Sequence, residues 1–328
     1  MRSSLGPLRL GRSPSRSTVS VVPVISRLVI RYMGSPCRCL SVREYSSQPP
    51  SLPVNPAMNT LQACRDLLQR LDRTLTLPAV AEILLPPREP VPGESDDFGF
   101  VVLEDGSVGP FYVSLPGVWR GVSRHREAGM ESARLARRMG APELADSALA
   151  LGAWNAIGQH LMTRAGFDPL QAGATKATLP EGARIGLVGY FRPLVERLLA
   201  RGHPVTVIER QPQRVPADAG VDLDTSPAAL ATCDRVFCTA SVLINDTVDE
   251  ILESCAGRVP VELIGPSASG LPDLLFARGV VAVGGLRITD VERLRQLQEA
   301  GESWGAAGSK YQLDPSCWPG VEALLQRL

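Results

Sequence analysis

Five short apolar runs, each followed by a helix-like stretch, constrain the fold of residues 183–328 more than any other feature. The runs are RIGLVGY, PVTVIER, RVFCTASVL, VPVELIGPS and VVAVGGLRI. The stretches between and after them, such as PLVERLLARG and DVERLRQLQEAG, repeat apolar residues at helical spacing. Strands that are apolar almost throughout and alternate with helices require a parallel sheet covered on both faces. We therefore predict an α/β fold with a Rossmann-like domain over residues 183–328.

The preceding segment has a different pattern. Apolar residues recur at helical spacing from Asn59 to Leu71, and the runs AVAEILLP, FGFVVLED and GPFYVSLP then suggest a small antiparallel meander. Helical periodicity returns over 127–139 and 143–164. These features predict a smaller α+β domain over residues 58–166. A stretch rich in glycine and proline, residues 167–182, reads as the linker between the two domains.

Residues 1–57 do not resemble either domain. They contain eight arginines against one glutamate, a net charge of +7, with many serines and prolines and no periodicity. Two interpretations stay open: a targeting or disordered tail, and a start codon assigned too far upstream, with Met58 as the true beginning. The apolar run VSVVPVISRLVI is too short and interrupted to span a bilayer, which takes about 20 apolar residues.

Composition limits the partners. The formal net charge of the 328 residues is zero, which argues against nucleic acid as a partner, and no segment predicts a membrane anchor, so we expect a cytoplasmic protein. The seven cysteines and three histidines form no recognisable metal-binding spacing, and buried reduced thiols are the simplest interpretation of the cysteines. Arginine is the usual cation of this chain, because lysine occurs only as Lys176 and Lys310.

In an open parallel sheet, ligands bind beyond the carboxyl ends of the strands. The first strand ends in Gly189-Tyr-Phe-Arg192, which lacks the third glycine of the dinucleotide fingerprint. Arg192 is a candidate to bind a carboxylate or a single phosphate by a bidentate contact. Glu209 ends the second strand twenty residues after Gly189, the position of a ribose-binding acid, although a solvated carboxylate explains it equally well.

The third strand carries hydroxyl groups on an otherwise apolar run. Thr239 and Ser241 lie at its end, and Asn245 follows in the loop before the next helix. A capping box formed by Thr247 and Glu250 accounts for the loop residues by helix chemistry alone. It does not account for the two hydroxyls on the strand, so we predict that Thr239, Ser241 and Asn245 contact a ligand.

The last two strands end in glycine-containing loops. The fourth leads into Gly265-Pro-Ser267-Ala-Ser-Gly, and the fifth delivers Gly284-Gly285, which lets main chain approach a ligand closely. Asn155 is a further candidate, since small residues surround it on its helix; a buried asparagine with a purely structural role is the alternative. We predict Gly265, Ser267 and Gly285 as ligand-binding positions, with Asn155 beside them.

These residues carry a family resemblance. The run from TASVLINDTVDEIL through IGPSASGLPDLLFARGVVAVGG to RITD, preceded by IGLVGYFRPL and VIER, resembles the Rossmann-like domain of the putative heavy-metal chelation family. Proteins of that family are uncharacterised and begin with an enolase amino-terminal-like domain, which residues 58–166 resemble. The resemblance implies an interdomain cleft with Asn155 on one side and, on the other, Glu209, Thr239, Ser241, Asn245 and Ser267.

The candidate residues suggest the kind of ligand. Thiophilic metals prefer thiolate and imidazole, whereas these side chains offer carboxylate, amide and hydroxyl oxygens. We therefore expect binding or processing of a small polar metabolite or metal chelate, with a metal ion or chelate as the only cofactor suggested. Two alternatives stay open: a nucleotide-cofactor enzyme that uses Glu209 as ribose ligand, and a non-catalytic regulatory subunit. Whether any reaction is catalysed, and whether the chain forms a homo-oligomer, also stays open.

Overall fold

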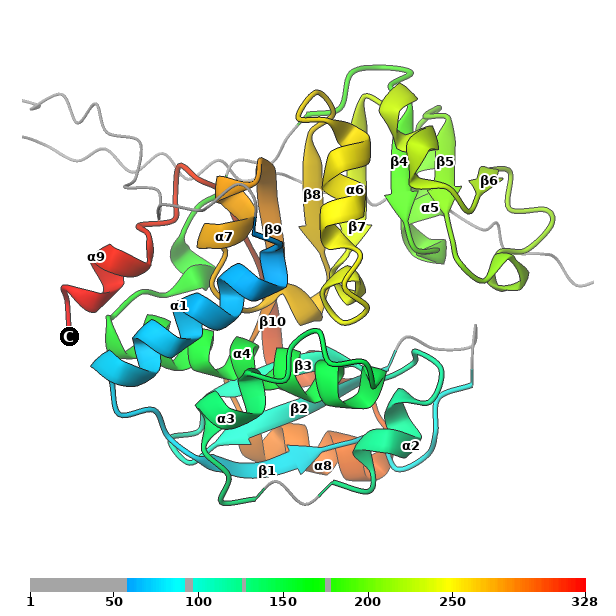
Figure 1. The fold of residues 1–328 in the computed structure, drawn as a ribbon. Helices are drawn as coiled ribbons and strands as arrows, with labels where there is room; N and C mark the ends of the chain where they lie inside the picture. Colours follow the sequence, from blue (N-terminus) through cyan, green and yellow to red (C-terminus); the bar gives the residue numbers. More distant parts are fainter. Residues whose placement is uncertain (1–57, 92–96, 126–127, 175–177) are drawn as a thin grey trace, which may run out of the picture. The chain divides into compact units, whose positions relative to one another are not determined.

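The computed structural model describes residues 58–328 except 92–96, 126–127 and 175–177 (Figure 1). Our expectation for residues 1–57 lies outside this range. All described residues fall within one compact unit of the chain. The division into domains over 58–166 and 183–328 therefore stays a prediction from sequence. No helix in the described part of the chain is both long and apolar enough to cross a membrane.

The predicted meander is confirmed. Strands β1 (Val80–Leu84), β2 (Phe98–Leu103) and β3 (Val108–Tyr112) form an antiparallel sheet in the order β1-β2-β3. Helix α4 (Leu144–Arg164) packs on this sheet, and all of its residues 147–162 are buried, which explains why it shows little polar face in the sequence. Helix α1 (Thr60–Thr74) precedes the sheet and buries the apolar positions expected of it. The two short helices between the sheet and α4 are α2 (Val118–Val122) and α3 (Ser132–Ala136).

The helix predicted over 127–139 is shorter than expected. Helix α3 covers five residues, and turns precede and follow it. Residues 126–127, at the start of the predicted helix, lie outside the described part. Gly129 has a φ of +80°, a left-handed conformation that a helix cannot continue through. The periodic apolar residues of this stretch are buried without one continuous helix to carry them.

The second sheet has seven strands in the order β10-β9-β8-β7-β4-β5-β6. The five predicted strands are β4 (Ile185–Val188), β5 (Val205–Ile208), β7 (Arg235–Thr239), β8 (Val261–Ile264) and β9 (Val280–Ile288). They pair in parallel, as the predicted α/β class requires. Two edge strands were not predicted: β6 (Asp222–Asp224), which is parallel, and β10 (Gly308–Leu313), which is antiparallel to β9.

Helices connect the strands mostly as predicted. They are α5 (Arg192–Leu199), α6 (Val248–Cys255), α7 (Asp273–Ala277) and α8 (Val291–Ala300), and α9 (Val321–Leu325) ends the chain. The stretch SPAALATC forms η3 (Pro227–Thr232), a 3-10 helix. Short 3-10 helices also follow several strands: η2 (Pro212–Arg214) after β5, η4 (Ala240–Leu243) after β7 and η5 (Pro266–Ala268) after β8.

The two faces of the large sheet differ. On β7, Val236 and Cys238 point to the face on which α6 packs, and α6 lies in front of β7 and β8 in Figure 1. Helix α5 packs instead over β4 and β5 on the opposite face, with Ile185 and Leu187 beneath it. Where that opposite face continues onto β7 and β8, it carries Thr239 and other half-buried side chains. This region of the sheet borders the cavity described below.

Elements that are distant in sequence complete both sheets. Phe100 and Val102 of β2 share one apolar cluster with Leu294 and Leu297 of α8. Near the start of α1, the backbone N–H of Thr60 donates to the Asp249 carboxylate at 2.7 Å, and the Arg278 guanidinium donates to the Thr60 hydroxyl at 2.6 Å. The small sheet and the first helix therefore depend on residues far along the chain for their packing.

Candidate functional site

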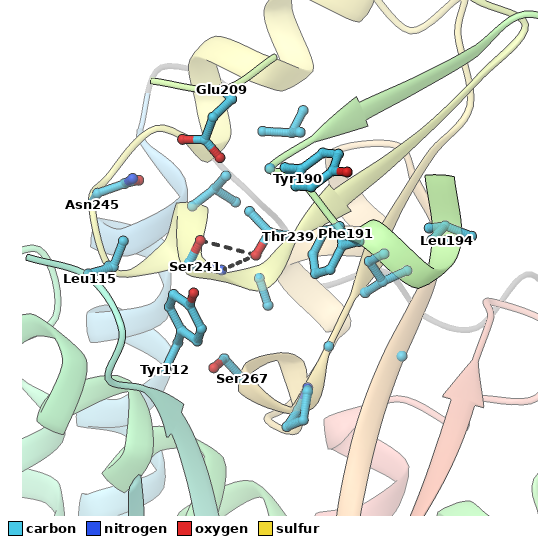
Figure 2. A pocket seen from close by; sticks show the side chains of 18 of the residues that line it. Tyr112, Leu115, Tyr190, Phe191, Leu194, Glu209, Thr239, Ser241, Asn245 and Ser267 are labelled. Atoms are coloured by element: carbon cyan, nitrogen blue, oxygen red, sulfur yellow. Dashed lines mark hydrogen bonds between the residues drawn. The ribbon is translucent and has the colours of Figure 1, made fainter. Parts of the chain in front are cut away.

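A cavity of about 1010 Å³ lies at the carboxyl ends of β4, β5, β7 and β8 (Figure 2). Its walls also include side chains from the small sheet and the loop that follows it, among them Tyr112 and Leu115. Seven of the nine predicted site residues line it: Glu209, Thr239, Ser241, Asn245, Gly265, Ser267 and Gly285. The carboxyl ends of parallel strands meet at one edge, which explains why residues distant in sequence converge here.

The end of β7 provides three polar groups. The Thr239 hydroxyl lies 3.1 Å from the Ser241 hydroxyl and accepts a hydrogen bond from the backbone N–H of Ser241 at 3.3 Å, which caps η4. Asn245 accepts a hydrogen bond on its side-chain oxygen from the Thr247 hydroxyl at 2.6 Å. The amide nitrogen of Asn245 is then the atom that remains for a ligand. Figure 2 shows Thr239 and Ser241 facing the same space as Tyr112 and Ser267.

The predicted capping box at the start of α6 is wrong. Thr247 is the residue that precedes α6, but its side chain makes no capping hydrogen bond to the helix. Its hydroxyl is directed to Asn245 instead. Asp246, between them, has a φ of +55°, so the turn that carries Asn245 adopts a left-handed conformation before the helix begins. The start of α8, by contrast, is capped by a side chain, because the Asp290 carboxylate accepts from the N–H of Arg293 at 2.9 Å.

Glu209 provides the carboxylate of the cavity. Its side chain is 8% exposed and accepts a hydrogen bond from the backbone N–H of Gln211 at 3.0 Å. The Arg214 guanidinium lies 3.9 Å from the other carboxylate oxygen and donates to the Tyr112 hydroxyl at 3.2 Å. A nearly buried carboxylate needs such compensation. Arg214 thus links Glu209 at the end of β5 to Tyr112 on β3.

Side chains of α4 and β10 hold the loop after β8 by hydrogen bonds to its backbone. The amide nitrogen of Asn155 donates to the carbonyl oxygens of Pro110, at 2.7 Å, and Ser267, at 2.9 Å. The Gln159 amide and the Tyr311 hydroxyl both donate to the Ser269 carbonyl oxygen, at 2.8 and 3.0 Å. Burial raises the pKa of Tyr311, so its hydroxyl stays a donor. The Ser267 hydroxyl itself is buried and has no partner among the described residues.

Two glycines on β9 differ in what they permit. A Cβ added to Gly285 would lie 2.4 Å from the Tyr311 ring, so Gly285 is needed for packing between β9 and β10. A Cβ added to Gly284 would meet only ordinary contacts, the nearest at 3.6 Å. Gly284 therefore leaves open space at the floor of the cavity. After β8, Gly265 has a φ of +109°, which residues with a side chain rarely adopt. Glycine at this position therefore allows the loop to bend.

Two predicted site residues do not line the cavity. Arg192 begins α5, its side chain is 72% exposed, and it pairs with Glu196 one turn further along the helix at 2.9 Å. Asn155 is 1% exposed and is occupied by the two carbonyl oxygens named above. These contacts agree with the alternative interpretation of Asn155, a buried asparagine with a structural role. Asn155 positions the backbone of a lining residue rather than facing the cavity.

Several lining residues were not predicted. Phe98 and Tyr112 belong to apolar runs that resemble ordinary core, and Trp304 lies in the glycine-rich stretch GESWGAAG, so no local signal relates them to the strand ends. Tyr190 and Phe191, which the sequence places in the loop after the first strand, do line the cavity. Two further lining residues had a usable signal: Glu262 is an acid inside the apolar run VELI, and Lys310 is one of only two lysines.

The residues do not fit a bare thiophilic metal ion. Within the described ranges, no group of three or more histidine, cysteine, aspartate or glutamate side chains is arranged to hold a metal. Burial raises the pKa of Cys64 to about 12 and that of Cys255 to about 11, so these thiols stay protonated and bind metal poorly. The described cysteines are unpaired and most are buried, in agreement with the sequence interpretation. The cavity offers mainly oxygen donors.

The fold and cavity define a mixed α/β protein with a parallel-rich sheet, a small antiparallel sheet and a cavity at the strand ends. Residues 174–314 match the sequence model of the DUF364 family, described as "putative heavy-metal chelation". The predicted resemblance to this family is thereby confirmed. An uncharacterized protein from Methanocaldococcus jannaschii is 26% identical over 178 residues, which cover 52% of this chain and 67% of the relative.

Two solved structures share the fold. A DUF364 protein of unknown function from Pyrococcus horikoshii has a TM-score of 0.57 and 21% identity, and the match covers 78% of this chain and 99% of that one. A second DUF364 protein, from Desulfitobacterium hafniense DCB-2, has a TM-score of 0.54 and 17% identity, with coverage of 77% and 98%. At these identities the likeness establishes the fold class.

Proposed function

We propose that this protein binds a small, oxygen-rich metabolite or its metal chelate at the strand ends, in a role connected with heavy-metal chelation. The observation that carries the proposal is the convergence of Glu209, Thr239, Ser241 and Asn245 on one cavity. Carboxylate, hydroxyl and amide groups recognise the oxygen atoms and hydroxyls of a polar organic molecule through hydrogen bonds. The family description supports the connection with chelation.

The donor set favours a chelate over a bare metal ion. Soft metals select thiolates and imidazoles. The four groups at the strand ends offer neither, whereas the outer oxygens of a chelator that already holds its metal are good hydrogen-bond partners. A volume of about 1010 Å³ is at the upper end of the range typical of small-molecule sites, about 300–1,000 Å³.

Calorimetry on the full chain with Cd²⁺ alone, citrate alone and iron(III) citrate tests this proposal. We expect citrate or its iron complex to bind and Cd²⁺ alone to bind more weakly. Ser241→Ala removes one hydroxyl and should weaken the affinity about tenfold, or about 1.4 kcal/mol, the upper part of the range for a single hydrogen bond. Tighter binding of Cd²⁺ than of either citrate species would overturn the proposal.

The nucleotide-cofactor alternative is tested in the same experiment. Pyrophosphate binding needs a slim loop before a helix with free amides. Here the Tyr190 and Phe191 rings line the cavity, and Pro193 removes one amide from the first turn of α5. We expect no binding of NAD tighter than about 1 mM. Micromolar binding that is lost in Glu209→Gln would establish the alternative instead.

A further inference from the structure

The cavity continues beyond the strand ends onto the face of the large sheet that α5 leaves open. Side chains alternate along a strand, and the pairing registers place Thr239, Glu262, Gly284 and Gln312 on one face of β7, β8, β9 and β10. All four line the cavity. The cavity therefore runs from the hydroxyls of β7 across the sheet to β10.

The far end of this face contains a buried charged network. Glu262 is 5% exposed; one of its carboxylate oxygens pairs with the Arg235 guanidinium, and the other accepts from the Gln312 amide at 3.1 Å. The three side chains of the network come from β7, β8 and β10. The network passes over β9, where Gly284 has no side chain. A buried ion pair contributes little net stability compared with well-packed apolar residues. Stability alone therefore gives little reason for a polar floor at this place in the sheet.

A cation, Lys310, lines the same cavity. Lys310 lies two residues before Gln312 on β10, and its ammonium group is 5.6 Å from the centroid of the Trp304 ring. No carboxylate of the described residues lies within ion-pair distance of it. Among the charged residues that line the cavity, four are basic and three acidic: Arg197, Arg210, Arg214, Lys310, Glu209, Glu250 and Glu262. Since Arg235 neutralises Glu262, the far end carries an excess positive charge.

We propose that the end of the cavity bounded by Glu262, Gln312 and Lys310 is a second subsite, which binds an oxyanion of the ligand. This inference rests on the proposed function, because the rest of the ligand lies at Ser241 and Glu209. The oxyanion, a carboxylate or a phosphate, contacts the Lys310 ammonium, and Gly284 leaves the space between the two subsites open. The ligand class is thus an elongated molecule with at least one anionic end.

The test is calorimetric titration of the full chain with citrate and, separately, with pyrophosphate. Lys310→Gln should weaken binding of at least one of them about tenfold, or about 1.4 kcal/mol, and added salt should reduce the difference because the contact is partly exposed. Lys310→Arg keeps the charge and should retain most of the affinity. Arg73→Gln, at an exposed arginine at the end of α1, removes the same charge outside the cavity and should have no effect.

Each outcome decides between the two proposals. If Ser241→Ala weakens binding and Lys310→Gln does not, the second subsite is wrong and the strand-end site stands. If Lys310→Gln weakens binding while Ser241→Ala and Glu209→Gln do not, the subsite stands and the proposed position at the strand ends is wrong. A response to citrate alone assigns a carboxylate, and a response to pyrophosphate alone assigns a phosphate. Binding of neither anion overturns the subsite.

Discussion

Replacing Asn155 with alanine should both destabilise the protein and loosen the loop after β8. The substitution removes the amide that donates to the carbonyl oxygens of Pro110 and Ser267, both in a buried environment. Each buried acceptor left without its donor costs about 1–3 kcal/mol, so we expect a loss of about 2–4 kcal/mol in the free energy of unfolding. For a protein of this size that corresponds to a fall in melting temperature of about 5–10 °C.

Two measurements separate loop positioning from general destabilisation. Thermal unfolding gives the loss of stability, and hydrogen exchange of residues 265–271 gives the local effect. The matched control is Ile157→Ala, a fully buried residue of the same helix whose truncation costs about 2–5 kcal/mol by loss of packing. We expect faster exchange in the loop for Asn155→Ala than for Ile157→Ala at equal loss of stability. Equal exchange in the two variants, or unchanged melting of Asn155→Ala, would refute the reasoning.

Two further predictions concern stability. Burial alone would raise the pKa of Asp105. Hydrogen bonds from His160 and Ser107 instead hold this pKa below its ordinary value of 3.8. The pair of Asp105 and His160 therefore stabilises the protein above about pH 4, and this stability is lost as the pH falls through the lowered pKa. In chemical denaturation at several pH values, Asp105→Asn should remove this part of the acid dependence. An unchanged pH profile of the variant would contradict the prediction. Gly285→Ala should cost about 1–3 kcal/mol because its Cβ would overlap the Tyr311 ring, while Gly284→Ala should be nearly neutral; equal melting temperatures would refute this difference.

The parallel part of the fold could be predicted because its strands are buried on both faces and its helices are amphipathic. The two missed strands lack that signal. All three residues of β6 are exposed, and β10 is an antiparallel edge strand that begins with Gly308 and two exposed polar residues. An edge strand forms by pairing with the free backbone groups of the neighbouring strand. This pairing does not require a particular side-chain pattern, so the sequence does not reveal it.

The sequence predicts those residues of the candidate site that lie directly at the carboxyl ends of the parallel strands. Thr239 and Ser241 were identified because hydroxyls are unusual in an apolar run. The placement of both on the strand was wrong for Ser241, since β7 ends at Thr239 and Ser241 lies in η4. Arg192 was not separable from a solvated surface residue, since its position on the first turn of a helix fits both uses and only the structure gives its pairing with Glu196. Tyr112 belongs to the other sheet, and no local pattern relates it to the strand ends.

The packing of α8 against the small sheet sets an order of events during synthesis. β1, β2 and β3 leave the ribosome early, but the apolar cluster that contains Phe100 also includes Leu297 and Ala307, near the end of the chain. Asp249, which anchors the start of α1, follows Thr60 by 189 residues. At about 5–20 residues per second that interval is about 10–40 seconds. During this time the nascent sheet exposes apolar residues that α8 covers in the folded chain.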